Sequence, residues 1–151
     1  MLIRRGASEI FEAFVEPELL RRFWLDSASA PLSADAEVTW HFKVPGVSDK
    51  LRVTVFDRPR RLAFRFSDGM DVDIRFDFHD GGATRVSVTC TGFKDENLLK
   101  TATDTAEGFA IVLCDLKTLL ETGRSANLVR DKAELITRQL AATGFKDLDI
   151  Q

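Results

Sequence analysis

The sequence predicts an α+β domain in which a curved antiparallel sheet wraps around one long helix near the C-terminal end. Two observations lead to this fold class. Between Val38 and Cys90, apolar and polar residues alternate in five segments that short turns separate, and such turns favour antiparallel neighbours. From Asp104 to Gly123 the apolar residues instead recur every three or four positions, as on one face of an amphipathic helix.

The composition fits one soluble domain that is large enough to bury a core. The chain has 151 residues, of which 44% are hydrophobic and 30% are charged. No run approaches the ~20 apolar residues of a membrane helix, and the N-terminal segment lacks the apolar stretch of a signal peptide. We therefore expect a cytoplasmic protein without a membrane partner.

Net charge and cysteine content argue against further classes of protein. The net charge is -3 and the arginines are scattered among acidic residues, so a nucleic-acid partner is not expected. Cys90 and Cys114 form neither a spaced metal-ligand set nor a disulfide framework, and both lie in apolar patterns. We interpret them as buried free thiols and expect no cofactor and no metal.

The N-terminal part predicts a short strand and two short helices. Met1 to Arg5 fits the strand, Ser8 opens a helix that runs to Val15, and Pro17 begins a second helix that ends near Trp24. A loop follows from Pro31 to Asp35.

The five alternating segments then predict strands, and each places its apolar residues on one face. They are Val38–Val44, Leu51–Val55, Leu62–Phe66, Val72–Phe78 and Val86–Cys90. Only one face of the sheet is therefore expected to be buried. Asp68-Gly69 is typical of a tight hairpin turn, and on the polar face Arg65 is expected to pair with Asp71 or Asp73.

The segment from Asp104 to Gly123 carries signals for both helix ends. Asp104 and Glu107 resemble a capping box, and Gly123 is placed as a C-cap. A twenty-residue helix and a nine-residue strand both span ~30 Å, so this helix is the natural cover for the apolar face of the sheet.

A further helix is predicted within Ser125 to Phe145, with Gly144 as its stop. Its apolar stripe consists of Val129, Ala133, Ile136 and Leu140. This helix either packs on the preceding domain or forms a homodimer contact.

Several strings resemble a known family. They are SEIFEAFVEPELLRRFW, RPRRLAFRF, DGGATRVSVTCTGF and GFAIVLCDLKTLLETG. The chain resembles, from about Ile3 to Gly123, the bacterial family named after the activator of heat-shock protein 90 ATPase, in the SRPBCC superfamily. The resemblance implies a START-like helix-grip domain over residues 1–123, with residues 124–151 as a C-terminal helical extension.

The helix-grip fold implies a cavity between the long helix and the sheet. Small residues gather in the N-terminal half of the helix and leucines in the C-terminal half, so we expect open volume near Ala106. The expected ligand-binding residues are Trp24, Trp40, Phe42, Val53, Phe64, Ile74, Phe76, Ala106, Phe109, Ala110 and Leu113. By analogy, the function is binding of a small apolar or amphipathic molecule; the alternative is that these side chains interlock as a filled core.

Two other function classes stay open. An enzyme could act on a ligand in the same cavity with Glu107 as a partly buried acid or base, although the sequence has no nucleophile elbow, phosphate loop or zinc signature. His41 and His79 are interpreted as surface residues. An interaction module, chaperone-related or homodimeric, could instead use the C-terminal helix or the turn bearing Arg58, Arg60 and Arg61.

Overall fold

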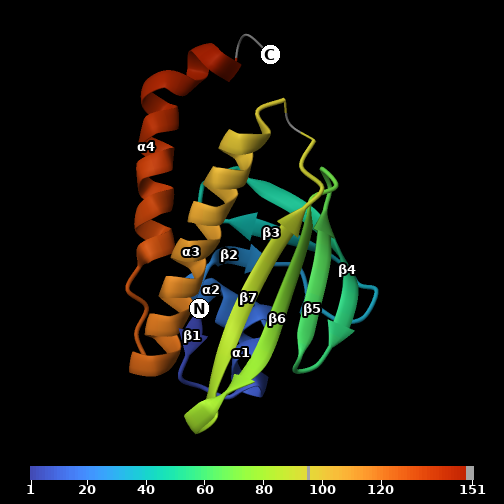
Figure 1. The fold of residues 1–151 in the computed structure, drawn as a ribbon. Coiled ribbons are helices and arrows are strands. Elements are labelled where there is room, and N and C mark those ends of the chain that lie inside the picture. Colours follow the sequence, from blue (N-terminus) through green and yellow to red (C-terminus); the bar gives the residue numbers. More distant parts are fainter. Residues whose placement is uncertain (95, 149–151) are drawn as a thin grey trace.

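The computed structural model describes residues 1–94 and 96–148 and contains one sheet and four α-helices in that part of the chain (Figure 1). In chain order, the elements are β1 (Leu2–Ile3), α1 (Ala7–Val15), α2 (Pro17–Phe23), β2 (Leu25–Ala28), β3 (Glu37–Phe42), β4 (Ser48–Asp57), β5 (Arg61–Phe66), β6 (Asp71–His79), η1 (Asp80–Gly82), β7 (Ala83–Thr91), α3 (Leu98–Thr122) and α4 (Leu128–Leu148).

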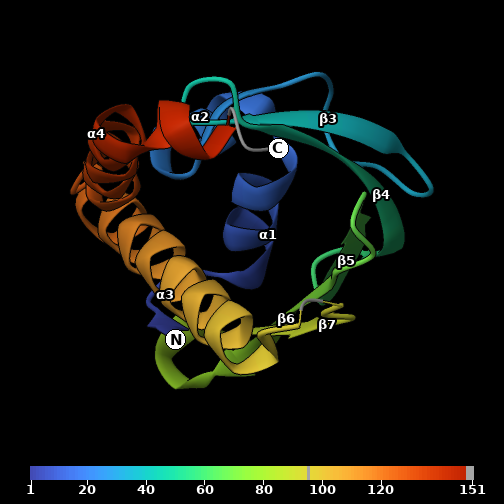
Figure 2. The ribbon, with the colours of Figure 1, turned by 90° about the horizontal axis from the view of Figure 1, so that it is seen from above.

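The sheet is antiparallel and has seven strands in the order β1-β7-β6-β5-β4-β3-β2. All five strands predicted from the alternating pattern are present. Seen from above, the sheet curves around α1, and α3 closes the open side of the curve (Figure 2). This arrangement confirms the α+β helix-grip class.

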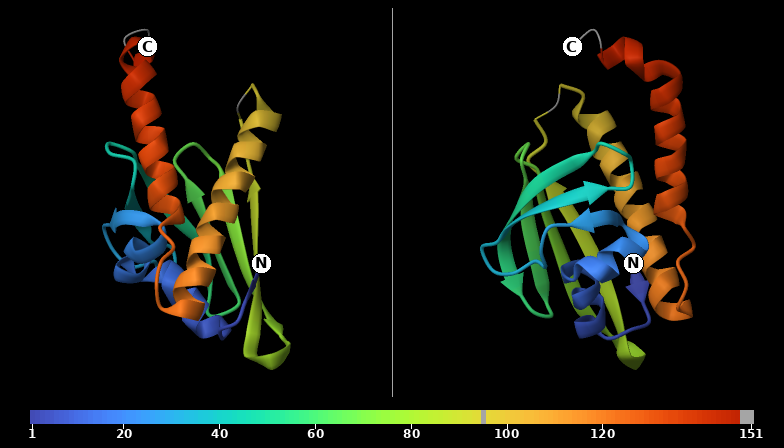
Figure 3. Two further views of the ribbon diagram at one scale, coloured as in Figure 1. Left: turned by 90° about the vertical axis from the view of Figure 1, so that its left-hand side faces the viewer. Right: turned by 180° about the vertical axis from the view of Figure 1, so that it is seen from behind.

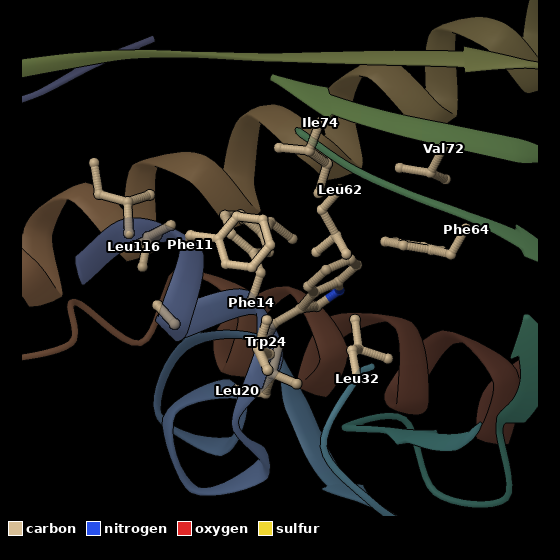
Figure 4. Close-up of a cluster of buried hydrophobic side chains, with 14 of the residues drawn as sticks. Phe11, Phe14, Leu20, Trp24, Leu32, Leu62, Phe64, Val72, Ile74 and Leu116 are labelled. Carbon is tan, nitrogen blue, oxygen red and sulfur yellow. The ribbon is translucent and has the colours of Figure 1, made fainter. Parts of the chain in front are cut away.

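The concave face of the sheet is buried against α1, α2 and the C-terminal half of α3 (Figure 4). Phe11 and Phe14 project from α1, Leu116 from α3 and Ile74 from β6, and each is fully buried. Phe11 and Phe14 also meet the ring of Phe76 at centroid distances of 5.3 and 5.9 Å. The base of the domain is therefore a filled core.

The strand predictions need three corrections. β2 was not predicted, because only Leu25 in that short segment is buried. A register shift in β4 follows Val53, so Val55 lies opposite Ala63 on the outer face and Phe56 turns toward Phe11. Phe78 was expected on the buried face but is 82% exposed at the end of β6.

The long helix begins earlier than predicted. Asn97 caps it, and its side-chain oxygen accepts a hydrogen bond from the backbone nitrogen of Lys100 at 3.3 Å. The capping-box interpretation of Asp104 and Glu107 is therefore wrong. At the other end the prediction is confirmed, because Gly123 has a φ of 81° and donates its backbone N–H to the carbonyl of Leu119.

α4 runs back beside α3, and the two helices diverge from the linker that joins them, like the arms of a V (Figure 3). α4 contacts both α3 and α2. The predicted stop at Gly144 is wrong, since the helix continues to Leu148.

Ion pairs cover the convex face of the sheet. Arg65 pairs with Asp71 at 2.8 Å, as the sequence predicted, and Arg61 pairs with Asp73 at 2.8 Å. In the turn between β4 and β5, Arg58 pairs with Glu12 of α1, on the other side of the sheet, and lies over the Phe11 ring at 5.1 Å. These arginines are thus engaged within the domain.

Gly92 allows a close approach between two chain segments. Its φ is +85°, and a Cβ atom there would lie 2.6 Å from the carbonyl oxygen of Gly69. Gly81 has a similar φ of +73° but has open space around the same position. Substitutions at these two glycines can therefore distinguish the effect of backbone strain from that of a steric clash.

We expect Gly92→Ala to lower the free energy of unfolding by at least about 2 kcal/mol, because backbone strain and clash add. Gly81→Ala should cost about 1 kcal/mol from backbone strain alone. Urea denaturation of both variants measures the difference. Equal losses would show that the segments around Gly69 and Gly92 separate without cost.

Candidate ligand-binding site

A pocket of about 320 Å³ lies between helices α3 and α4 and the ends of β3 and β5. Its walls are mostly apolar. The lining residues are Trp24, Phe42, Lys43, Val44, Phe66, Met70, Thr105, Gly108, Phe109, Ile111, Val112, Val129, Lys132, Ala133 and Ile136.

α3 supplies one wall because its N-terminal half is not packed into the core. The buried positions of this helix begin at Val112. At Gly108 an added Cβ atom would meet no other atom within 4 Å, so the missing side chain leaves space in the pocket. Phe109 packs edge-on against Trp24 at a centroid distance of 5.5 Å.

The other wall, α4, is tied to α3 by a buried carboxylate. The Asp115 side chain is 1% exposed. It accepts hydrogen bonds from the Ser125 hydroxyl at 2.6 Å and from the backbone nitrogen of Val129 at 3.3 Å. Val129 lies in the first turn of α4, where backbone N–H groups have no partner within the helix. Asp115 therefore fixes the linker and the start of α4 together.

In the part of the chain that the structure describes, two lysines, Lys43 and Lys132, are the charged residues of the pocket lining. Lys43 donates a hydrogen bond from Nζ to the backbone carbonyl of Arg21 at 3.0 Å. Burial lowers the pKa of the Lys43 ammonium below its usual value, whereas the charges of Asp26 and Asp115 oppose that shift. Lys132 pairs with Glu107 at 3.0 Å.

A second depression, of about 530 Å³, lies on the opposite side of α3, between the helix and β7. Ala106 and Ala110 line it together with Cys90, and burial raises the pKa of the Cys90 thiol to about 11. Thr105 and Phe109 border both spaces. Phe109 thus stands between the pocket and this groove.

The structure separates the expected ligand-binding residues into three groups. Those at the pocket are Trp24, Phe42 and Phe109, and those at the groove are Ala106, Phe109, Ala110 and Leu113. The remaining residues line neither the pocket nor the groove. They are at most 3% exposed and belong to the core: Trp40, Val53, Phe64, Ile74 and Phe76. The sequence left two alternatives open, an open cavity and a filled core. Both kinds of packing occur in the structure, in different parts of the interior.

Trp40 lies at the centre of the filled part. Its ring meets Trp24 at 5.0 Å and Phe64 at 5.1 Å. Its indole nitrogen has no hydrogen-bond partner among the described residues. This part of the interior is therefore held by packing.

Sequence reasoning missed the contribution of α4 and of the lysines. The stripe of Val129, Ala133 and Ile136 was assigned to the C-terminal helix but not to a pocket wall. The helical spacing in the sequence revealed this stripe, but it did not reveal which part of the protein the stripe contacts. The alternation placed Lys43 on the polar face of a strand predicted to run to Val44, but β3 ends at Phe42. Lys43 lies one residue beyond the strand and lines the pocket.

Glu107 does not have the environment expected of a partly buried acid or base. Its side chain is 55% exposed and pairs with Lys132. His41 and His79 are exposed. Within residues 1–94 and 96–148 there is no metal-binding group of three or more His, Cys, Asp or Glu side chains, and no helix there is long and apolar enough to span a membrane.

The sheet, the enclosed α1 and the long α3 define a helix-grip domain of the START-like, SRPBCC class. The sequence profile of the family described as activator of Hsp90 ATPase homolog 1-like protein matches residues 5–121. The chain belongs to this family. The matched region ends just before the linker to α4. No curated protein matches the chain.

Solved structures with the same fold come from several bacteria. A crystal structure of a Staphylococcus saprophyticus protein is 25% identical, with a TM-score of 0.74, and the match covers 83% of this chain and 90% of that one. The solution structure of the Aha1 dimer from Colwellia psychrerythraea is 17% identical, with a TM-score of 0.71, covering 83% and 95%. An AHSA1-like protein from Aeromonas hydrophila is 20% identical, with a TM-score of 0.65, covering 82% and 91%.

We expect Asp115→Asn to destabilise the protein by about 1–3 kcal/mol and to loosen α4, because the amide replaces an ionised acceptor of two hydrogen bonds. Asp104→Asn, in an exposed ion pair on the same helix, should change stability by less than about 0.5 kcal/mol. Urea denaturation measures both losses, and hydrogen exchange reports on α4. Unchanged protection of α4 in Asp115→Asn would contradict the role of this carboxylate.

Proposed function

We propose that the protein binds a small apolar or amphipathic molecule in the pocket between α3 and α4. The observation that carries this proposal is an apolar space of about 320 Å³ beside the Trp24 and Phe109 rings. Small-molecule sites have volumes of roughly 300–1,000 Å³ and mostly apolar walls with a few polar groups. Membership in the family, with its START-like fold, agrees with a ligand-binding or chaperone-related module.

In this proposal, residues 1–123 form the helix-grip domain and residues 124–151 add a wall to its open end. The apolar side chains of α4 support this division. Ala133 is buried and Val129 and Ile136 are half-buried, and all three line the pocket. The enzyme alternative has less support, since the exposed, paired Glu107 lacks the burial that would adapt it to acid or base chemistry.

Gly108 offers a direct test of the pocket. We expect Gly108→Leu to weaken binding of a neutral apolar fluorescent probe, N-phenylnaphthylamine, by roughly tenfold or more, because the new side chain would occupy the open space. Replacing glycine inside a helix should also maintain or raise stability. Fluorescence titration and thermal unfolding measure the two effects.

Ala106→Leu is the matched control. Ala106 is two residues away on α3 but lines the groove on the other side of the helix, so this variant should bind the probe as the native chain does. Unchanged affinity in Gly108→Leu, or equal losses in both variants, would contradict binding in the pocket.

Self-association is a second candidate, and the outer side of α4 favours it. Leu128 and Leu135 are seven positions apart, so they lie on one side of the helix, and they are 38% and 66% exposed. Contiguous exposed apolar residues often mark interfaces. The Colwellia psychrerythraea relative was solved as a dimer, which agrees with this candidate.

We expect Leu135→Glu to convert a dimer into a monomer in sedimentation equilibrium, because it would place a charge in an apolar contact. Phe78→Glu is the control: Phe78 is 82% exposed at the far end of β6, and its replacement should leave the mass unchanged. A native chain that stays monomeric as its concentration is raised would rule out the dimer.

A further inference from the structure

The charged side chains that line the pocket between α3 and α4 in the described part of the chain are positive. Among the described residues, Lys43 and Lys132 are the charged ones that line the pocket, and Thr105 is the other polar side chain; no Asp or Glu of this part of the chain lines it. A bound cation would meet two ammonium groups in a largely apolar surrounding, where charge interactions are weakly screened. An anion would meet them as partners.

The two lysines differ in how far they are already engaged. Lys132 is 46% exposed and is neutralised by Glu107 at 3.0 Å. Lys43 is half-buried, and the hydrogen bond that the described residues provide for its ammonium goes to a neutral acceptor, the Arg21 carbonyl. An ammonium has three donors, so Lys43 retains donor capacity for a ligand.

The charged groups near Lys43 come from four elements. Asp26 of β2 and Asp115 of α3 are negative, whereas Arg21 of α2 and Arg130 of α4 are positive. Asp115 is committed to Ser125 and Val129. Arg21 is itself paired with Glu18 at 3.5 Å. Among the described residues no carboxylate forms an ion pair with Lys43, so its positive charge at this end of the pocket is not neutralised by direct contact.

We propose that the ligand of this pocket is an amphipathic anion, with an apolar body against Trp24, Phe109 and α4 and a single anionic head group bound by the Lys43 ammonium. This inference rests on the proposed function and narrows its ligand class. A charge-assisted hydrogen bond to the head group is stronger than one to a neutral acceptor. Lys43 therefore selects the ligand by the charge of its head group. The apolar walls supply contact area but do not distinguish one head group from another.

Isothermal titration calorimetry with decanoate and decanol tests the inference. The two probes share a chain length and differ in the head group, and decanoate is ionised at neutral pH. Both probes are used below their aggregation concentrations. We expect the native chain to bind decanoate about tenfold more tightly than decanol, in line with the strength of hydrogen bonds between charged groups.

Variants at Lys43 test whether this residue causes the preference for decanoate over decanol. Lys43→Gln should remove the tenfold preference for decanoate over decanol, whereas Lys43→Arg should retain the preference because it keeps the charge. Lys132→Gln should reduce it by at most about threefold, since an exposed ion pair contributes little. Lys50→Gln, at an exposed position on β4, is the control for a general change in net charge, and thermal unfolding checks that each variant is folded.

The outcomes distinguish this inference from the proposed function. Equal affinities for decanoate and decanol in the native chain, or a preference that survives in Lys43→Gln, would overturn the anionic ligand while leaving an apolar site in place. Binding of neither probe would overturn both proposals. A preference that is lost in Lys43→Gln and retained in Lys43→Arg and Lys50→Gln would establish Lys43 as the residue that binds the head group.

Discussion

The constraint on which the structure depends is that the concave face of the sheet must be covered along its whole length. Burial of apolar surface is the main driving force for folding, and that face carries large side chains from β3 to β7. At its base, α1, α2 and the leucine-rich half of α3 supply the cover, and the side chains there are fully buried. Toward the start of α3 the cover thins, and the pocket and the groove are the result.

α4 completes the cover at that open end, and both packing and polar contacts attach it to the domain. Burial decreases along its apolar stripe, since Ala133 is 7% exposed whereas Leu140 is 51% exposed. The buried Asp115 binds the Ser125 hydroxyl and the Val129 N–H. An ionised buried acceptor is stable only when its hydrogen-bond partners are in place. The same carboxylate therefore fixes the start of α4 and one wall of the pocket.

The sequence allowed most of the fold to be predicted, because alternation of apolar residues over five strands and a helical stripe both require one buried face. The bulge that turns Phe56 inward and Val55 outward could not be predicted, since an extra residue in one strand leaves no mark on composition. The start of α3 was missed because Leu98 and Leu99 are exposed and give no amphipathic signal. Open volume near Ala106 was predicted, and the groove between α3 and β7 lies there. The pocket on the other side of α3 was not predicted, since the position of its second wall, α4, depends on tertiary contacts such as the hydrogen bonds of Asp115.

α3 therefore has two different halves, as its gradient of small and large residues suggested. From Val112 onward its inner residues belong to the core, and substitutions there act on stability. Before Val112 its residues face open volume on two sides, with Phe109 between the pocket and the groove. Phe109 rests edge-on against Trp24 and borders both spaces. Under the proposed function, the residues before Val112 would contact the ligand together with those of α4, and family membership defines the fold but not the ligand.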